Sequence, residues 1–123
     1  DSLHLSGVHA FQLGWFDESI RFFAKALQLN SQFAPLCLNF GSALQKLRRY
    51  EDALSSFDKA ISIKPDYAEA FYNRGVTLKE LGRIDEALES YDKAIAISSD
   101  YVEALNNRGV FRKLWKISIK SSL

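Results

Sequence analysis

The chain has 123 residues, the length of one domain, and its 16 basic and 15 acidic residues leave a net charge of +1. That near-balance argues against a nucleic-acid partner, because nucleic-acid-binding domains usually carry a strongly basic face. Hydrophobic residues make up 47% of the sequence, which excludes a disordered chain, and no apolar run approaches the ~20 residues of a membrane span.

Cysteine content and the first residues bear on location. The single cysteine, Cys37, excludes an intramolecular disulfide and favours a reducing compartment, so we expect a cytoplasmic protein. The first residues, Asp1 to His4, show neither the basic region nor the apolar core of a signal peptide. The chain lacks a starting methionine, which leaves open a processed chain or a piece of a longer one.

An internal repeat dominates the sequence. Residues 68–100 align with the segment that begins at residue 34, so that small residues fall on small ones and large on large. The aligned pairs are Gly41 and Gly75, Ala53 and Ala87, Phe57 and Tyr91, and Ala60 and Ala94. The members of each pair are 34 residues apart, a period that predicts a helical solenoid.

The repeat divides the chain into units, each expected to be a helix, a tight turn and a second helix. Complete units are predicted over residues 1–33, 34–67 and 68–101, followed by a partial unit over 102–117 and a frayed tail over 118–123. The predicted fold class is therefore all-α, a single-domain solenoid of antiparallel helix pairs.

The first two units show their helix boundaries in the sequence. Gly14 and Trp15 interrupt the helical pattern of the first unit. Its second helix is expected to begin near Asp17, where the helix dipole favours negative charge. The second unit turns at residues 48–50, and its second helix ends at Pro65, because proline cannot continue a helix.

The third and fourth units begin alike and end differently. In the third, Asp66 and then Glu69 are typical of a capping box at a helix start, and Gly82 marks the turn. The fourth matches the third beyond Gly109 only if one residue is deleted, so one half of its helix is expected to pack in register. The second helix of this unit is missing.

The end of the chain is basic and apolar. After Glu103 come five cations and no acid, with Trp115 and Ile117 among the interleaved apolar residues. We expect this segment to cap the solenoid, because terminal repeats must be covered to stay soluble. The alternatives are self-association through residues 110–119 and, less favoured, binding to an acidic membrane surface.

Glycines recur inside the predicted helices, where each costs ~1 kcal/mol relative to alanine. The four positions are Gly7, Gly41, Gly75 and Gly109. A cost repeated in every unit indicates that the two helices of a unit approach closely at the glycine. We expect Phe23, Phe57 and Tyr91 to fill the space between units.

The third unit carries a family pattern in the spacing of small, aromatic and aliphatic residues. These residues are Phe71, Arg74, Gly75, Leu78, Ala87, Tyr91 and Ala94. They resemble the tetratricopeptide repeat, and the likeness extends to about residue 109. Departures occur where Arg74 and Arg108 replace the usual leucine and where Ser31 and Ser99 replace the usual proline. The resemblance implies a right-handed superhelix whose first helices line a concave groove that binds a peptide or a partner helix.

If the resemblance holds, one face of each first helix lines the groove. The residues expected there are His4, Val8, Leu38, Asn39, Ser42, Glu69, Tyr72, Asn73, Val76, Lys79, Asn106 and Asn107, with Val110 continuing the face. Asn39, Asn73 and Asn107 recur at one register, and each amide offers a donor and an acceptor to the backbone of an extended peptide.

This series is similar to the asparagine ladder in the repeat domain of O-linked N-acetylglucosamine transferases, whose bacterial relatives often place such repeats ahead of a catalytic domain. The alternative is that these are exposed amides of common family sequence, and Leu5 breaks the series in the first unit.

Some chaperone cofactors of the family hold a C-terminal carboxylate with a clamp of lysine, asparagine and arginine side chains. The positions here that match this clamp are His4, Val8, Asn39, Glu69 and Asn73. Only one of the clamp's asparagines is retained and its lysines are absent. We therefore do not expect that class of ligand.

Patterns of catalytic and metal sites are missing from the sequence. Cys37 falls at a packing position of the repeat, which indicates a core thiol, and His4 and His9 lack metal-ligand spacing. No HExxH, GxSxG or P-loop pattern occurs. We expect no enzyme activity, no cofactor and no metal.

The sequence thus predicts a non-catalytic protein–protein interaction module that binds a protein or peptide ligand in the groove. One alternative is the substrate-recognition arm of a larger enzyme such as a glycosyltransferase. The altered sequence after Gly109 counts against it, because it is typical of a natural end to a repeat array. Another alternative is a self-assembling scaffold.

Overall fold

The computed structural model describes residues 2–122, with the side chains of residues 2–110, 112 and 113. Over this range the chain forms helices and no strand. The helices are α1 (Ser2–Gln12), α2 (Phe16–Leu29), α3 (Ala34–Lys46), α4 (Tyr50–Ile63), α5 (Ala68–Glu80), α6 (Ile84–Ile97) and α7 (Val102–Ser122). The predicted all-α class is confirmed.

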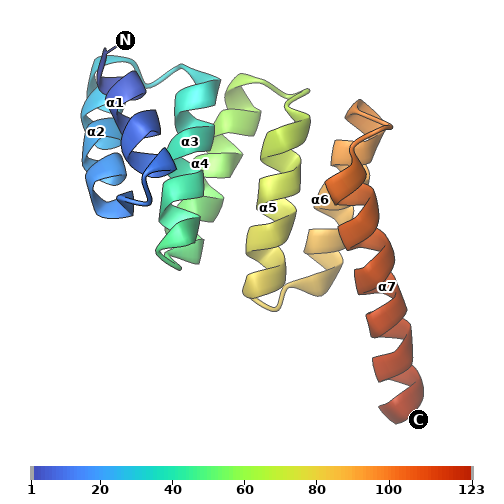
Figure 1. Cartoon of the computed structure of the whole chain (residues 1–123). Helices are drawn as coiled ribbons and strands as arrows, with labels where there is room; N and C mark the ends of the chain where they lie inside the picture. Colours follow the sequence, from blue (N-terminus) through green and yellow to red (C-terminus); the bar gives the residue numbers. More distant parts are fainter. Residues whose placement is uncertain (1, 123) are drawn as a thin grey trace.

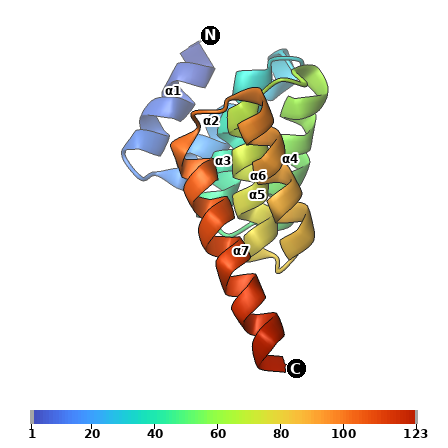
Figure 2. The same cartoon turned by 90° about the vertical axis from the view of Figure 1, so that its right-hand side faces the viewer.

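The helices stack as antiparallel pairs in two rows. α1 packs with α2, α3 with α4 and α5 with α6, and each second helix also packs on the first helix of the following unit. Figure 1 shows α1, α3, α5 and α7 in front of α2, α4 and α6, with α1 and α7 at opposite ends of the array. Figure 2 shows the far half of α7 extending past the other helices. The predicted solenoid is also confirmed.

The turns inside the units share one backbone conformation at matching positions. Gly14 and Gly82 have φ values of 80° and 77°, a left-handed conformation that glycine adopts without steric cost. Arg48 holds the same position with a φ of 62°, where its Cβ makes the conformation strained. The same chain reversal is thus made by glycine twice and by arginine once.

Each helix pair is closed by an aromatic ring that lies against a glycine. A Cβ added to Gly41 would lie 2.6 Å from Cε1 of Phe57, and Tyr91 lies in the same way against Gly75. Both rings are fully buried. The prediction that glycine marks the closest approach of the helices is confirmed. At Gly109 an added Cβ would meet nothing within 4 Å, since no second helix packs on α7 in the described chain.

The same rings reach the next unit. Phe23 clusters with Leu36 and Ala43 of α3, and Phe57 clusters with Ala70 of α5. The prediction that these aromatics fill the space between units is therefore correct only in part, because each ring fills the interior of its own unit as well.

The junctions between units differ at one position on the first helix. Phe40 of α3 packs, half-buried, on the apolar cluster between α2 and α3. At the matching position of α5, Nε of Arg74 donates to Oδ1 of Asp58 over 2.7 Å. In α7, Nη1 of Arg108 donates to Oδ1 of Asp92 over 3.2 Å. This repeated pair shows that the front half of α7 packs in the register of α5.

The predicted capping box is wrong. α5 begins at Ala68 with Tyr67 at the N-cap, and no side chain caps this helix end. Asp66 therefore lies one residue too early to act as the cap, and Glu69 falls at the second helical position where a capping box needs the third.

The end of the chain also differs from the prediction. α7 continues to Ser122, so residues 118–122 are helical where a frayed tail was expected. Residues 110–122 contain no glycine or proline, the residues that most disfavour a helix. Leu123 and the side chains of Trp115 and Ile117, on which the prediction of self-association depended, lie outside the described part of the structure.

Candidate functional site

The first helices of the units form one continuous face. Backbone contacts join α1 directly to α3 and α3 to α5. A hollow of about 150 Å³ opens on this face. It is lined by Val8, Phe11, Phe23, Asn39, Ser42 and Glu69. The structure therefore brings together four predicted groove residues, Val8, Asn39, Ser42 and Glu69, from three helices.

Asn39 is held by a side chain of the preceding unit. Its Nδ2 lies 2.8 Å from Nε2 of His4. An amide nitrogen only donates, so Nε2 accepts and the imidazole is neutral with its proton on Nδ1. The ring meets Phe23 and Phe33 edge-on, with centroids 5.9 and 5.7 Å away. Burial, followed by the positive chain terminus, lowers the pKa of His4 from its ordinary value of 6.5.

Asn107 is held in the same way at the other end of the face. Its Nδ2 donates to Oη of Tyr72 over 3.0 Å. Tyr72 stacks on Tyr101 with centroids 5.3 Å apart, and burial, with a smaller effect of Glu69, raises the pKa of Tyr101 to about 12. Burial also raises the pKa of the neighbouring Tyr91. Both phenols therefore stay protonated at neutral pH.

Asn73, in the middle, has no such partner. Leu38 holds the position of His4 and Tyr72, is 4% exposed, and cannot accept a hydrogen bond. The backbone carbonyl of Asn73 accepts from Gln45, but its side-chain amide bonds no residue that the structure describes. Because Asn73 is only half-buried, its amide is the free one among these three asparagines.

The other predicted groove residues vary in exposure. Val76 and Lys79 of α5 are half-buried, and Asn106 of α7 is exposed. Val76 also packs on the core cluster that contains Tyr91. Leu38 lies in the core around Phe57 and offers little surface to a ligand.

Two features of this face escaped the sequence reasoning. Phe11 belongs to the wall of the hollow, although it was not among the predicted groove residues. The bonds from Asn39 to His4 and from Asn107 to Tyr72 span 35 residues, whereas the repeat compares positions 34 apart. The sequence held one signal for these bonds: the matching positions His4, Leu38 and Tyr72 carry a polar group, an apolar one and a polar one in turn.

The described residues give little support to a reactive thiol, a metal site or a membrane-spanning helix. Cys37 is 2% exposed and burial raises its pKa, which disfavours the reactive thiolate. Within residues 2–122, no group of three or more His, Cys, Asp or Glu side chains is placed to hold a metal. No helix in the described residues combines the length and apolar character needed to cross a membrane.

Family models of the tetratricopeptide repeat match the chain over residues 38–102 and over residues 1–33. The first match alone covers more than half of the 123 residues, so the chain belongs to the tetratricopeptide repeat family. A search of curated proteins gives no match.

Solved structures of such domains superpose on nine tenths or more of this chain. The first domain of Spaghetti (RPAP3), bound to the HSP90 peptide SRMEEVD, has a TM-score of 0.90 at 23% identity, covering 94% of this chain and 91% of that one. The Sgt2 domain from Aspergillus fumigatus has a TM-score of 0.93 at 17% identity, covering 100% and 83%. The second domain of human RPAP3, in complex with the HSP70 peptide SGPTIEEVD, has a TM-score of 0.84 at 22% identity, covering 90% and 96%. At these identities the similarity establishes the fold.

Proposed function

We propose that the face formed by α1, α3, α5 and α7 binds an extended peptide of another protein, and that Asn73 bonds the peptide backbone. The observation that carries the proposal is the contrast among the asparagines. Asn39 and Asn107 are bonded to side chains of the preceding unit, whereas the amide of Asn73 keeps both its donor and its acceptor for a ligand. Backbone recognition of this kind does not depend on the sequence of the peptide.

The hollow supplies a preference for one peptide side chain. Its walls combine the apolar Val8 and Phe11 with the polar Ser42 and the carboxylate of Glu69. A side chain with an apolar stem and a basic or neutral end fits such walls better than an acidic one, because Glu69 repels negative charge.

The complexes of the two RPAP3 domains support this use of the fold, since both hold a peptide. Those peptides end in EEVD, an acidic sequence. We do not extend that ligand to this chain, because Glu69 lies at the hollow and because His4 and Val8 stand at matching clamp positions, where no lysine is present.

We further propose that the domain is non-catalytic. Membership of the family supports this, because tetratricopeptide repeats are generally interaction modules. The relatives described above give no support to the glycosyltransferase resemblance, so a role as the recognition arm of such an enzyme stays a prediction. The cytoplasmic location stays a prediction too.

A random-peptide array tests the proposal. The native chain is compared with Asn73→Ala and with the matched control Asn107→Ala, which removes an amide that is already bonded. Binding that is lost in Asn73→Ala and kept in Asn107→Ala supports the groove and gives the peptide consensus. Binding that survives in Asn73→Ala, or no binding by the native chain, contradicts the proposal.

A further inference from the structure

We propose that a second surface of the protein binds the projecting end of α7 of another copy, so that copies associate head to tail. This surface, the N-terminal face, is formed by Leu5, Trp15, Asp17, Glu18 and Phe22. It lies apart from the asparagines of the peptide groove and does not depend on the function proposed for them.

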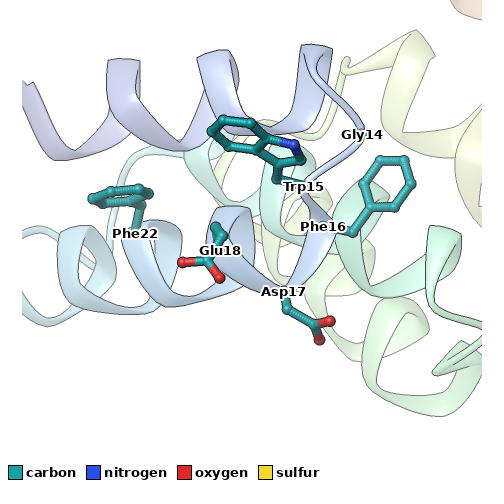
Figure 3. Close-up of a pocket in the computed structure, with 6 residues that line it drawn as sticks. All are labelled: Gly14, Trp15, Phe16, Asp17, Glu18 and Phe22. Atoms are coloured by element: carbon teal, nitrogen blue, oxygen red, sulfur yellow. The ribbon is translucent and has the colours of Figure 1, made fainter.

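The N-terminal face is apolar and hollowed. Trp15 is 58% exposed and Leu5 is 68% exposed. Hollows of about 620 and 420 Å³ share Trp15 and Phe22 in their walls. Figure 3 shows the rings of Trp15 and Phe22 facing a common space with Glu18 beside it, while Phe16 points the other way. Exposed tryptophan in such a setting is typical of a binding hot spot.

The repeat itself does not explain this tryptophan. The matching positions in the second and third units hold Arg49 and Arg83. Arg49 binds Asp52 over 2.8 Å and Arg83 binds Glu86 over 2.7 Å, three residues onward in each case. The residues that match Phe22 are likewise polar, both being serine. Of the three complete units, only the first therefore has aromatic side chains where the other two have an arginine in an ion pair and a serine.

Loss of that arginine leaves the N-terminal face with negative charge. Asp17 forms no ion pair with the described residues. Glu18 has only Arg21, 3.3 Å away, in a pair whose two side chains are 50% and 69% exposed. Such a pair contributes little, so a basic partner would compete for Glu18 at small cost.

The projecting end of α7 has the complementary character. α7 has 21 residues where α5 has 13, so about 12 Å of helix extends beyond the length of a repeat helix (Figure 2). Just before this extension, Lys113 is exposed without an ion pair among the described residues. Further along come Lys116 and Lys120, and no acidic residue follows Glu103.

The two surfaces lie at opposite ends of the array (Figure 1). Each copy would therefore use a different surface toward each neighbour. Such heterologous contacts do not close on themselves in pairs, and they build rings or open chains. The occupant is a second copy because the same sequence carries both the acidic aromatic face and the basic helix end.

Light scattering on the full chain tests the proposal with two variants. Trp15→Arg gives the first unit the residue of the other two, and Lys113→Glu/Lys116→Glu reverses charge on α7. Leu29→Arg is the matched control, because Leu29 is 73% exposed and lies outside the N-terminal face. We expect the native chain and the control to gain mass with concentration, and each test variant to bind at least tenfold more weakly and stay near 14.0 kDa.

Mixing the two test variants gives the decisive result. Each keeps one intact surface, so the mixture should form a one-to-one dimer and nothing larger. A native chain that is monomeric at all concentrations overturns the proposal, as does association that persists in Trp15→Arg or a mixture that stays monomeric. A monomeric native chain whose N-terminal face binds an unrelated basic amphipathic peptide would assign the surface to a different partner. Circular dichroism melts show that every variant is folded.

Discussion

The junction between the second and third units lacks a side-chain hydrogen bond that both neighbouring junctions have among the described residues. At the first junction Asn39 bonds His4, and at the third Asn107 bonds Tyr72. At the middle junction Leu38 holds the matching position, and the side-chain amide of Asn73 bonds no residue that the structure describes. At all three junctions the second helix of one unit packs on the first helix of the next.

This difference teaches that the fold and the binding face are specified by separate positions. Closure of each unit by an aromatic ring on a glycine is the same in the three complete units. The residue that precedes each asparagine by 35 positions varies without disturbing that closure. A repeat protein can therefore change which amides a ligand meets while keeping its solenoid.

The largest effect is expected where the three units agree. Gly41→Ala adds a methyl group 2.6 Å from Cε1 of Phe57, a fully buried ring, and buried side chains in protein interiors are closely packed. We expect the free energy of unfolding to fall by about 1–3 kcal/mol. Gly109→Ala is the matched control, since nothing lies within 4 Å of the added methyl. It should be neutral or stabilise by up to ~1 kcal/mol. Urea unfolding measures both, and equal effects would contradict the aromatic closure.

The next effect separates the middle asparagine from the last. Asn73→Ala removes a donor and an acceptor for the ligand, each worth about 0.5–1.5 kcal/mol. We expect the affinity for an array-selected peptide to fall about tenfold, which is about 1.4 kcal/mol, with stability unchanged. Asn107→Ala should do the reverse. Calorimetric titration and thermal melts of both variants test this, and the comparison fails if both lose affinity equally.

A third change removes the partner of the last asparagine. Tyr72→Phe keeps the stack on Tyr101 but takes away the oxygen that accepts from Asn107. We expect a loss of about 1 kcal/mol in the free energy of unfolding. Tyr67→Phe is the matched control, because its hydroxyl makes no hydrogen bond with the described residues. A Tyr72→Phe variant as stable as this control would show that the bond contributes nothing.

The smallest effect concerns pH at the first junction. The pKa of His4 is lowered in the folded chain, so the unfolded chain binds more protons just below the ordinary value of 6.5. Stability should then rise with pH through that window and fall as the pH drops below 6.5. His4→Gln should flatten this dependence, whereas His9→Gln, at an exposed position, should leave it as in the native chain. Denaturant midpoints measured between about pH 5 and 8, a range that brackets the ordinary histidine pKa of ~6.5, provide the test.

The helix pairs and their turns could be predicted from the sequence because they repeat with a fixed period. The 34-residue spacing of glycines and aromatics located the helix pairs, and Gly14 and Gly82 located turns that need a left-handed residue. The same comparison of equivalent positions failed for the asparagines. It treats Asn39, Asn73 and Asn107 as alike, although their state depends on a residue one position out of register in the preceding unit.

Helix ends were predicted less well, for a local reason. Asp66 and Glu69 have the spacing of a capping box, but the chain enters α5 one residue later than that spacing requires. The length of α7 was underestimated, because no glycine or proline after Gly109 ends the helix before Ser122. Patterns of residue type therefore predicted the helices better than they predicted where each helix begins and ends.

The most direct test of peptide binding follows the side-chain amides by nuclear magnetic resonance during titration with an array-selected peptide. The amide protons of Asn73 should shift in proportion to the bound fraction. Those of Asn107, already bonded to Tyr72, should move little. Shifts confined to Trp15 and α7, with Asn73 unchanged, would contradict binding at the groove and place the peptide elsewhere on the molecule.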